Sequence, residues 1–185
     1  GDLSGTDRLI RFLSIVYAPL VEEVGFRLVL VGGTGVLIAA LLGAGRYSML
    51  ALWNPGEVVK RHLREAVRPG ASWTLAAAAV VSALIFGFSH LAANSGWETG
   101  KVTTASLTGL VLAWLYVKYG FAAAVMTHWS FNYFLQVFYV VGQDPGLGFL
   151  YTGAFMAVTF SGIFATALLA ARLVSAFVRK GRHST

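Results

Sequence analysis

Two adjacent carboxylates, Glu22 and Glu23, lie in an apolar stretch of the sequence, with Arg27 one helical turn further on. An ionisable side chain in the middle of a bilayer costs about 2.5–3.5 kcal/mol, so a group of three indicates a functional site. Two histidines, His90 and His128, interrupt two other apolar stretches. Carboxylates and imidazoles transfer protons, activate water and bind zinc. The sequence therefore predicts a reactive polar site inside a membrane.

Helical spacing separates the two carboxylates. Glu23 and Arg27 are four residues apart, the spacing at which a carboxylate and a guanidinium meet on one helix face. Glu22 is rotated from Glu23 by about 100° and lacks that partner. We therefore predict a structural Glu23–Arg27 ion pair and expect Glu22 to face a cavity. Pro19 predicts a kink in the same helix, with a backbone carbonyl freed beside it.

Each histidine is followed by an asparagine four residues later, in His90–Asn94 and in His128–Asn132. This spacing places both side chains of a pair on one helix face. One such pair alone is typical of a hydrogen bond between packed membrane helices. Together with the two glutamates and the arginine, the two pairs favour a single shared site.

The composition is that of an integral membrane protein. Of its 185 residues, 57% are hydrophobic and 12% are charged, about half the charged share of a soluble domain. Several apolar stretches reach the roughly 20 residues that cross a hydrocarbon core. We expect an all-α fold, a polytopic transmembrane helical bundle of about five spans plus a cytoplasmic-side amphipathic helix. Residues 1–185 are expected to form a single domain, a core shortened at its N-terminus.

The predicted spans follow the apolar stretches and the turn residues between them. They cover residues 9–31, 73–93, 102–117, 121–141 and 149–178. The first span is expected to end at Gly32-Gly33, before a short apolar run. Asn54-Pro55 has the sequence of a helix start. The helix that it opens, 56–67, is basic and amphipathic, and we predict that it lies on anionic headgroups.

Most basic residues lie in two loops between the predicted spans and in the C-terminal tail. If the chain crosses the membrane five times, these three segments all lie on the same side. Their basic residues are Arg46, Lys60, Arg61, Arg64, Arg68, Lys118, Arg179, Lys180 and Arg182. The positive-inside rule makes this side cytoplasmic. The net charge of +6 is therefore explained by orientation and lipid contact, and no soluble basic domain exists that would bind nucleic acid. The absence of cysteine excludes disulfides, thiolate ligands and a cysteine nucleophile.

Three motifs occur in order on three separate predicted membrane helices. Residues 22–27 fit E-E-x-x-x-R, residues 86–90 fit F-x-x-x-H and residues 128–132 fit H-x-x-x-N. Each is weak alone, but the ordered set resembles the signature of the CPBP intramembrane proteases. That family comprises the type II CaaX prenyl endopeptidases and the bacteriocin-processing and immunity (Abi) proteins. The resemblance covers approximately residues 9–139.

The resemblance implies an intramembrane endopeptidase of a multi-pass cell membrane protein, with its cavity open to the cytoplasmic side. Its partners would be membrane lipid and the C-terminus of a peptide or prenylated protein. Glu22 would be the general base that activates water with His90, and His128 and Asn132 would stabilise the oxyanion. The supporting residues would be Glu23, Arg27, Phe86 and Asn94.

Zinc is the one cofactor that the resemblance raises, since relatives have been described as metalloproteases. Glu22, His90 and His128 would be its ligands and would leave a position for water. The sequence has no H-E-x-x-H motif, and these ligands would come from three helices. We therefore favour metal-independent glutamate chemistry and keep zinc as the alternative.

Other functions remain as rival hypotheses. A rhomboid-type serine protease would use Ser89 or Ser130, but the glycine expected after the nucleophile is missing. An aspartyl protease is excluded because every aspartate lies outside the predicted spans. A proton-coupled transporter would use the glutamates and histidines as a relay. A haem protein would use His90 and His128 as axial ligands.

Overall fold

The computed structural model describes residues 8–92, 99–142, 146 and 148–182. Every regular element in these ranges is helical, and they contain no strand, which confirms the predicted all-α membrane bundle. The chain divides into two compact units, residues 1–133 and 134–185, and each is described by itself. The single domain over residues 1–185 stays a prediction.

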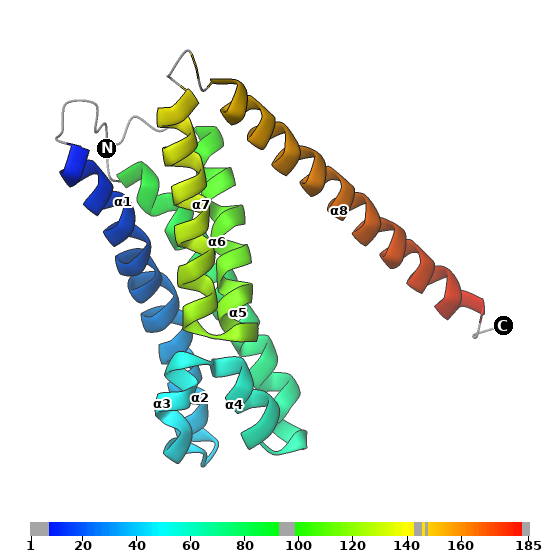
Figure 1. Ribbon diagram of the computed structural model, residues 1–185. Helices are drawn as coiled ribbons and strands as arrows, with labels where there is room; N and C mark the ends of the chain where they lie inside the picture. The colour runs from blue at the N-terminus through cyan, green and yellow to red at the C-terminus, as the bar shows by residue number, and fades with distance from the viewer. Residues whose placement is uncertain (1–7, 93–98, 143–145, 147, 183–185) are drawn as a thin grey trace. The chain divides into compact units, whose positions relative to one another are not determined.

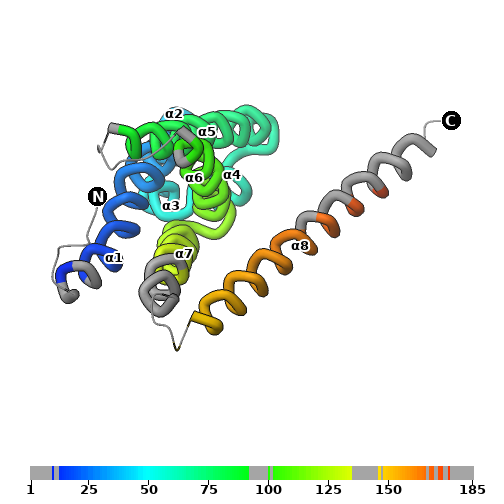
Figure 2. Tube along the Cα trace, turned by 90° about the horizontal axis from the view of Figure 1, so that it is seen from above, coloured from blue at the N-terminus to red at the C-terminus, as the bar shows by residue number. Residues whose placement is uncertain are grey.

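The first unit starts with three helices that follow one another without a break: α1 (Arg8–Glu23), the π-helix η1 (Val24–Gly32) and α2 (Gly33–Leu41). Short helices come next: η2 (Gly45–Tyr47), α3 (Ser48–Trp53), α4 (Pro55–His62) and η3 (Glu65–Val67). The long helices α5 (Arg68–Ala92) and α6 (Thr99–Tyr119) and the first part of α7 (Phe121–Gly142) complete it. Figure 1 shows α2, α3 and α4 gathered at one end of the long helices. In the view from above, α6 lies between α5 and α7 (Figure 2).

Three helical stretches are long and apolar enough to cross a membrane: Leu13–Leu41, Glu65–Leu91 and Gly148–Ala165. The third belongs to α8 (Gly148–Arg182), the long helix of the second unit. Helices α6 and α7 occupy the two remaining predicted spans and begin within a few residues of the predicted starts. The protein is therefore an integral membrane protein built from helices.

The predicted end of the first helix at Gly32-Gly33 is wrong, because the helix continues to Leu41. Gly32 instead permits close packing. A Cβ atom there would overlap the Tyr116 hydroxyl and lie 2.9 Å from the Leu52 carbonyl oxygen. The fully buried Tyr116 hydroxyl donates a hydrogen bond to that same carbonyl. Gly32 therefore does not end the first helix. It lets α6 and α3 approach that helix closely.

The amphipathic helix α4 begins where the sequence predicts. The Asn54 side chain caps it by accepting a hydrogen bond from the Glu57 amide at 3.1 Å. It ends earlier than predicted because Leu63 is extended. Val58 and Val59 are buried in the core of the bundle. The apolar face of α4 therefore packs against protein, while Lys60 and Arg61 stay exposed. Contact of this basic face with anionic headgroups stays a prediction.

The basic loops of the first unit share one end, as their charge predicts. The turn between α6 and α7 contains Gly120, with a φ of 93° that favours glycine. A Cβ atom on Gly120 would lie 3.1 Å from the Trp53 carbonyl oxygen, so this turn packs against the junction of α3 and α4. The Lys118 turn and the basic loop 46–68 are therefore neighbours. That this end faces the cytoplasm stays a prediction.

Small residues bring α5 and α6 close together. Ala79, Ala83 and Gly87 repeat at four-residue intervals on α5, and Ala105, Gly109 and Ala113 do so on α6; all six are buried. A Cβ atom on Gly87 would overlap the Ser106 hydroxyl and lie 2.9 Å from the Val102 carbonyl oxygen. This is the small-xxx-small packing that membrane helices use in place of large apolar side chains.

Gly87→Ala should therefore separate α5 from α6. We expect the protein to lose about 1–3 kcal/mol of stability through overpacking, measured as a lower Tm in detergent. Gly70→Ala is the matched control on the same helix, because a Cβ atom there meets nothing within 4 Å. Equal Tm values for the two variants would contradict the close packing.

Candidate active site

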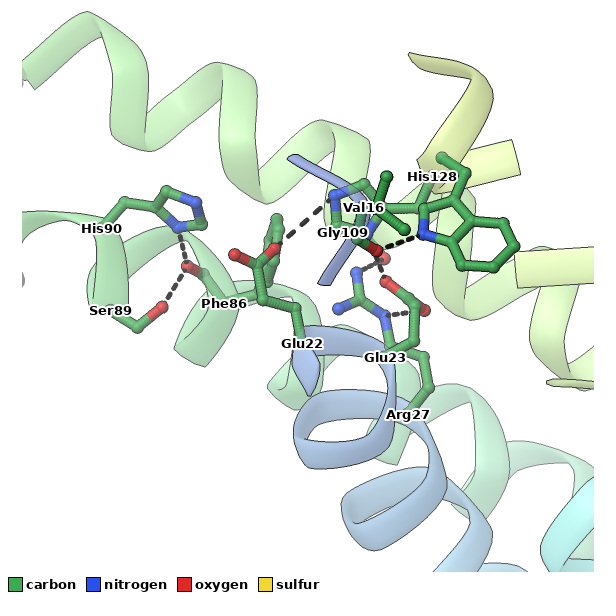
Figure 3. Close-up of polar contacts among 10 residues, drawn as sticks. Val16, Glu22, Glu23, Arg27, Phe86, Ser89, His90, Gly109 and His128 are labelled. Carbon is green, nitrogen blue, oxygen red and sulfur yellow. Dashed lines mark hydrogen bonds and ion pairs between the residues drawn. The ribbon is translucent and has the colours of Figure 1, made fainter. Parts of the chain in front are cut away.

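Three helical segments supply the side chains of one polar cluster (Figure 3). The end of α1 and the start of η1 supply Glu22, Glu23 and Arg27. Helix α5 supplies His90, and α7 supplies His128. The sequence predicted that the charged group and the histidines share one site, and the structure brings them together there.

The predicted ion pair between Glu23 and Arg27 is confirmed. Arg27 Nε lies 3.3 Å from Glu23 Oε2, and both side chains are fully buried. Arg27 Nη2 also donates a hydrogen bond to the Gly109 carbonyl of α6 at 3.1 Å. The guanidinium carbon lies 4.5 Å from the centre of the Phe86 ring, an attractive cation–π arrangement. The arginine therefore ties the first helix to α5 and α6 while it neutralises Glu23.

Glu23 has a second partner that sequence reasoning missed. His128 Nδ1 donates a hydrogen bond to Glu23 Oε1 at 2.8 Å, and the imidazole is almost completely buried. On the other side of the ring, Nε2 lies 3.5 Å from Glu22 Oε2. The two residues of the Glu23–His128 contact are 105 positions apart, so no local spacing could reveal it.

Glu22 occupies a different environment from Glu23. Its side chain is 29% exposed, whereas that of Glu23 is fully buried. Its carboxylate lies between the imidazoles of His90 and His128 (Figure 3), and both rings interact with it electrostatically. This is the division between the two carboxylates that their helical positions predicted.

His90 is oriented by the backbone of its own helix. Its Nδ1 donates to the Phe86 carbonyl at 2.7 Å, so Nε2 is the acceptor atom of a neutral ring. The Phe86 ring meets the His90 ring edge-on at 4.7 Å and the His128 ring edge-on at 5.9 Å. Phe86 therefore separates the two imidazoles and supports the arginine, which fits its predicted supporting role.

The remaining predicted residues are two asparagines and two serines. Asn132 is half-buried on α7, one turn beyond His128 and on the same helix face. Residue Asn94, the predicted partner of His90, lies outside the described residues. The Ser89 and Ser130 hydroxyls each donate to a carbonyl of their own helix at 2.8 Å, as expected of side chains without a nucleophilic role.

The site does not fit the zinc ion that the family resemblance raised. No three His, Cys, Asp or Glu side chains within the described ranges are arranged to hold a metal ion, and those ranges include Glu22, His90 and His128. His128 is also poorly placed as a haem ligand, because both of its ring nitrogens face carboxylate oxygens. The arrangement instead suits proton transfer and hydrogen bonding by the side chains themselves.

Trp129 positions α7, and sequence reasoning missed it. Its Nε1 donates to the Val16 carbonyl of α1 at 2.6 Å. Pro19 has no N–H to donate to the Ile15 carbonyl one turn earlier, and the Trp129 bond falls on the neighbouring Val16 carbonyl. The spacing of the sequence gives no signal for this contact between distant helices. A second tie joins η1 to α5, since the Ser82 hydroxyl donates to the Phe26 carbonyl at 2.6 Å.

A protein-family model described as type II CAAX prenyl endopeptidase Rce1-like matches residues 5–134. The matched range contains all three motifs and the whole polar cluster. No curated protein and no solved structure matches the chain.

Trp129→Phe should keep the aromatic packing but remove the donor to Val16. We expect a loss of about 0.6–2 kcal/mol, typical of a hydrogen bond between membrane helices, and a lower kcat because His128 is the adjacent residue. Thermal unfolding in detergent and peptide cleavage measure the two effects. Trp73→Phe is the control, because Trp73 is 77% exposed. Wild-type Tm and kcat in both variants would contradict a positioning role for Trp129.

Proposed function

The chain belongs to the type II CAAX prenyl endopeptidase family, Rce1-like, which is a family of membrane proteases. We propose that it cleaves a peptide bond near the C-terminus of a prenylated protein and that Glu22 is the general base. One observation carries the proposal: the partly exposed Glu22 carboxylate lies between two imidazoles, while its neighbour Glu23 is buried in an ion pair. These environments support a chemical role for the first carboxylate and a structural role for the second.

The substrate would approach from the end of the bundle that carries the basic loops. Those loops favour a cytoplasmic location for that end, which makes the cell membrane the site of action. Exposed apolar side chains cover much of the long helices, among them Phe88, Leu107 and Phe131. A prenyl chain would remain in the lipid beside such a surface, while the peptide reaches the polar cluster.

Water activation falls to Glu22 and His90. Glu22 takes a proton from a water molecule as the water oxygen forms a bond to the scissile carbonyl carbon. His90 accepts the second hydrogen bond of that water through Nε2, because its Nδ1 proton is held by the Phe86 carbonyl. Two acceptors fix the orientation of the attacking oxygen, and no metal ion is required.

The carbonyl oxygen becomes negatively charged when the new bond forms. His128, through Nε2, and the Asn132 side-chain amide would donate hydrogen bonds to it. Donors that are fixed in a site with little water stabilise such an oxyanion strongly, since they need no reorganisation. When the carbon–nitrogen bond breaks, the proton on Glu22 passes to the leaving amine, and the protein and the shorter peptide are released.

The proposal is tested with purified protein and a farnesylated C-terminal peptide. We expect cleavage that survives a chelator, and a loss of kcat of about 10³-fold or more in Glu22→Gln, since a general base contributes roughly 10²–10⁴-fold. His90→Ala and His128→Ala should be similarly inactive. Glu57→Gln is the matched control, because that glutamate pairs with Arg61 on the surface of α4. Retained turnover in Glu22→Gln would remove Glu22 from the mechanism.

Asn132→Ala tests the second oxyanion donor. We expect kcat to fall by about 10²–10³-fold, the loss typical of one oxyanion-hole donor, with a smaller change in KM. Ser130→Ala on the same helix is the control, because its exposed hydroxyl donates to the Met126 carbonyl of its own helix. An effect confined to KM would assign Asn132 to substrate binding instead.

A further inference from the structure

The two oxygens of the Glu23 carboxylate face different partners. Oε2 lies 3.3 Å from Arg27 Nε. This contact is an ion pair, and Oε2 has no hydrogen-bond partner among the described residues. Oε1 accepts a hydrogen bond from His128 Nδ1 at the shorter distance of 2.8 Å. The closer contact of this buried carboxylate is therefore with the imidazole of His128. Helical spacing alone predicts only its contact with Arg27.

The contacts of the His128 ring with two carboxylates indicate where its protons lie. A carboxylate can only accept, so the proton of the short contact is on Nδ1. The opposite ring atom, Nε2, faces the Glu22 carboxylate at 3.5 Å. Glu22 is ionised in its proposed role as general base, so a lone pair on Nε2 would repel its carboxylate, whereas a proton on Nε2 attracts it. Both ring nitrogens therefore carry protons.

The charges of the cluster lead to the same assignment. With Glu22 ionised as the proposed base, Glu22 and Glu23 contribute two negative charges, and Arg27 contributes one positive charge. A doubly protonated His128 makes the group neutral, and an uncompensated charge at a membrane-embedded site is costly. His90 differs, because its Nδ1 faces a neutral backbone carbonyl rather than a carboxylate.

We infer that Glu23 is a positioning residue that acts through His128: it holds the proton on Nδ1 and keeps the ring doubly protonated, so that Nε2 donates toward the reaction centre. This inference rests on the proposed function, in which His128 stabilises the oxyanion. Arg27 takes part by holding Glu23 against α5 and α6. A carboxylate on one imidazole and a carbonyl on the other thus give the two histidines opposite roles, one as donor and one as acceptor.

A purely structural ion pair makes a different prediction. In that case Glu23 and Arg27 would matter equally, and the loss of either would change stability and leave the protons of His128 in place. The positioning role requires the two substitutions to differ.

The test uses the full chain in detergent with ¹⁵N-labelled histidine, and the ring signals of His128 are assigned with His128→Gln. Ring ¹⁵N shifts distinguish a doubly protonated imidazole from a neutral one. We expect a doubly protonated His128 in the wild type and in Arg27→Met, and a neutral ring in Glu23→Gln. Cleavage by Glu23→Gln should show kcat lower by about 10²-fold, as for a lost oxyanion donor, with KM nearly unchanged. Glu23→Asp should recover part of kcat.

Glu23→Gln leaves a buried arginine without its partner and can fail to fold. The double variant Glu23→Gln/Arg27→Met removes both charges, a change that buried ion pairs commonly tolerate. It should also contain a neutral His128. A doubly protonated His128 in this variant, or equal kcat losses in Glu23→Gln and Arg27→Met, would overturn the inference. The spectra do not depend on turnover, so a wild-type protein with the expected spectra but no peptide cleavage would overturn the proposed function alone.

Discussion

The buried Glu23 carboxylate, shared between a cation of its own helix and an imidazole of α7, is the interaction on which the rest of the structure depends. A charge in an apolar bundle must be compensated by neighbouring groups. Arg27 supplies the opposite charge and extends to the Gly109 carbonyl and the Phe86 ring. His128 supplies the short hydrogen bond. Satisfying one carboxylate therefore brings α5, α6 and α7 to the first helix, and the partly exposed Glu22 is placed beside two imidazoles as a result.

Irregular backbone makes this arrangement possible. Pro19 removes one backbone hydrogen-bond donor from α1 a turn before the carboxylates, and the carbonyl of Val16 is bonded by Trp129 of α7. The π-helix η1 follows directly, and Ser82 of α5 bonds its Phe26 carbonyl. π-Helical turns are rare in proteins and are frequent at functional sites. The proline and the π-helix therefore flank Glu22, and each region is bonded by a side chain of a helix that also supplies a histidine.

Local spacing predicted more of this protein than distant contacts did. The Glu23–Arg27 pair followed from four-residue spacing, and the α4 start followed from Asn54, because both depend on neighbours along the chain. Gly32 was misread as a helix end, because glycine serves close packing as well as chain reversal. The Glu23–His128 bond could not be predicted, since it depends on how α7 is rotated against α1. The motifs identified the residues that meet, and only the structure gives each imidazole its hydrogen-bond partner.

The most direct measurement of the central claim is a double-mutant cycle between Glu22 and His128, with single-turnover cleavage of a farnesylated peptide as the readout. Residues that act as one catalytic unit are strongly non-additive. The account predicts that Glu22→Gln/His128→Gln is no slower than the slower of the two single variants. Losses that multiply in the double variant would show that the carboxylate and the imidazole act independently, and would contradict a shared site.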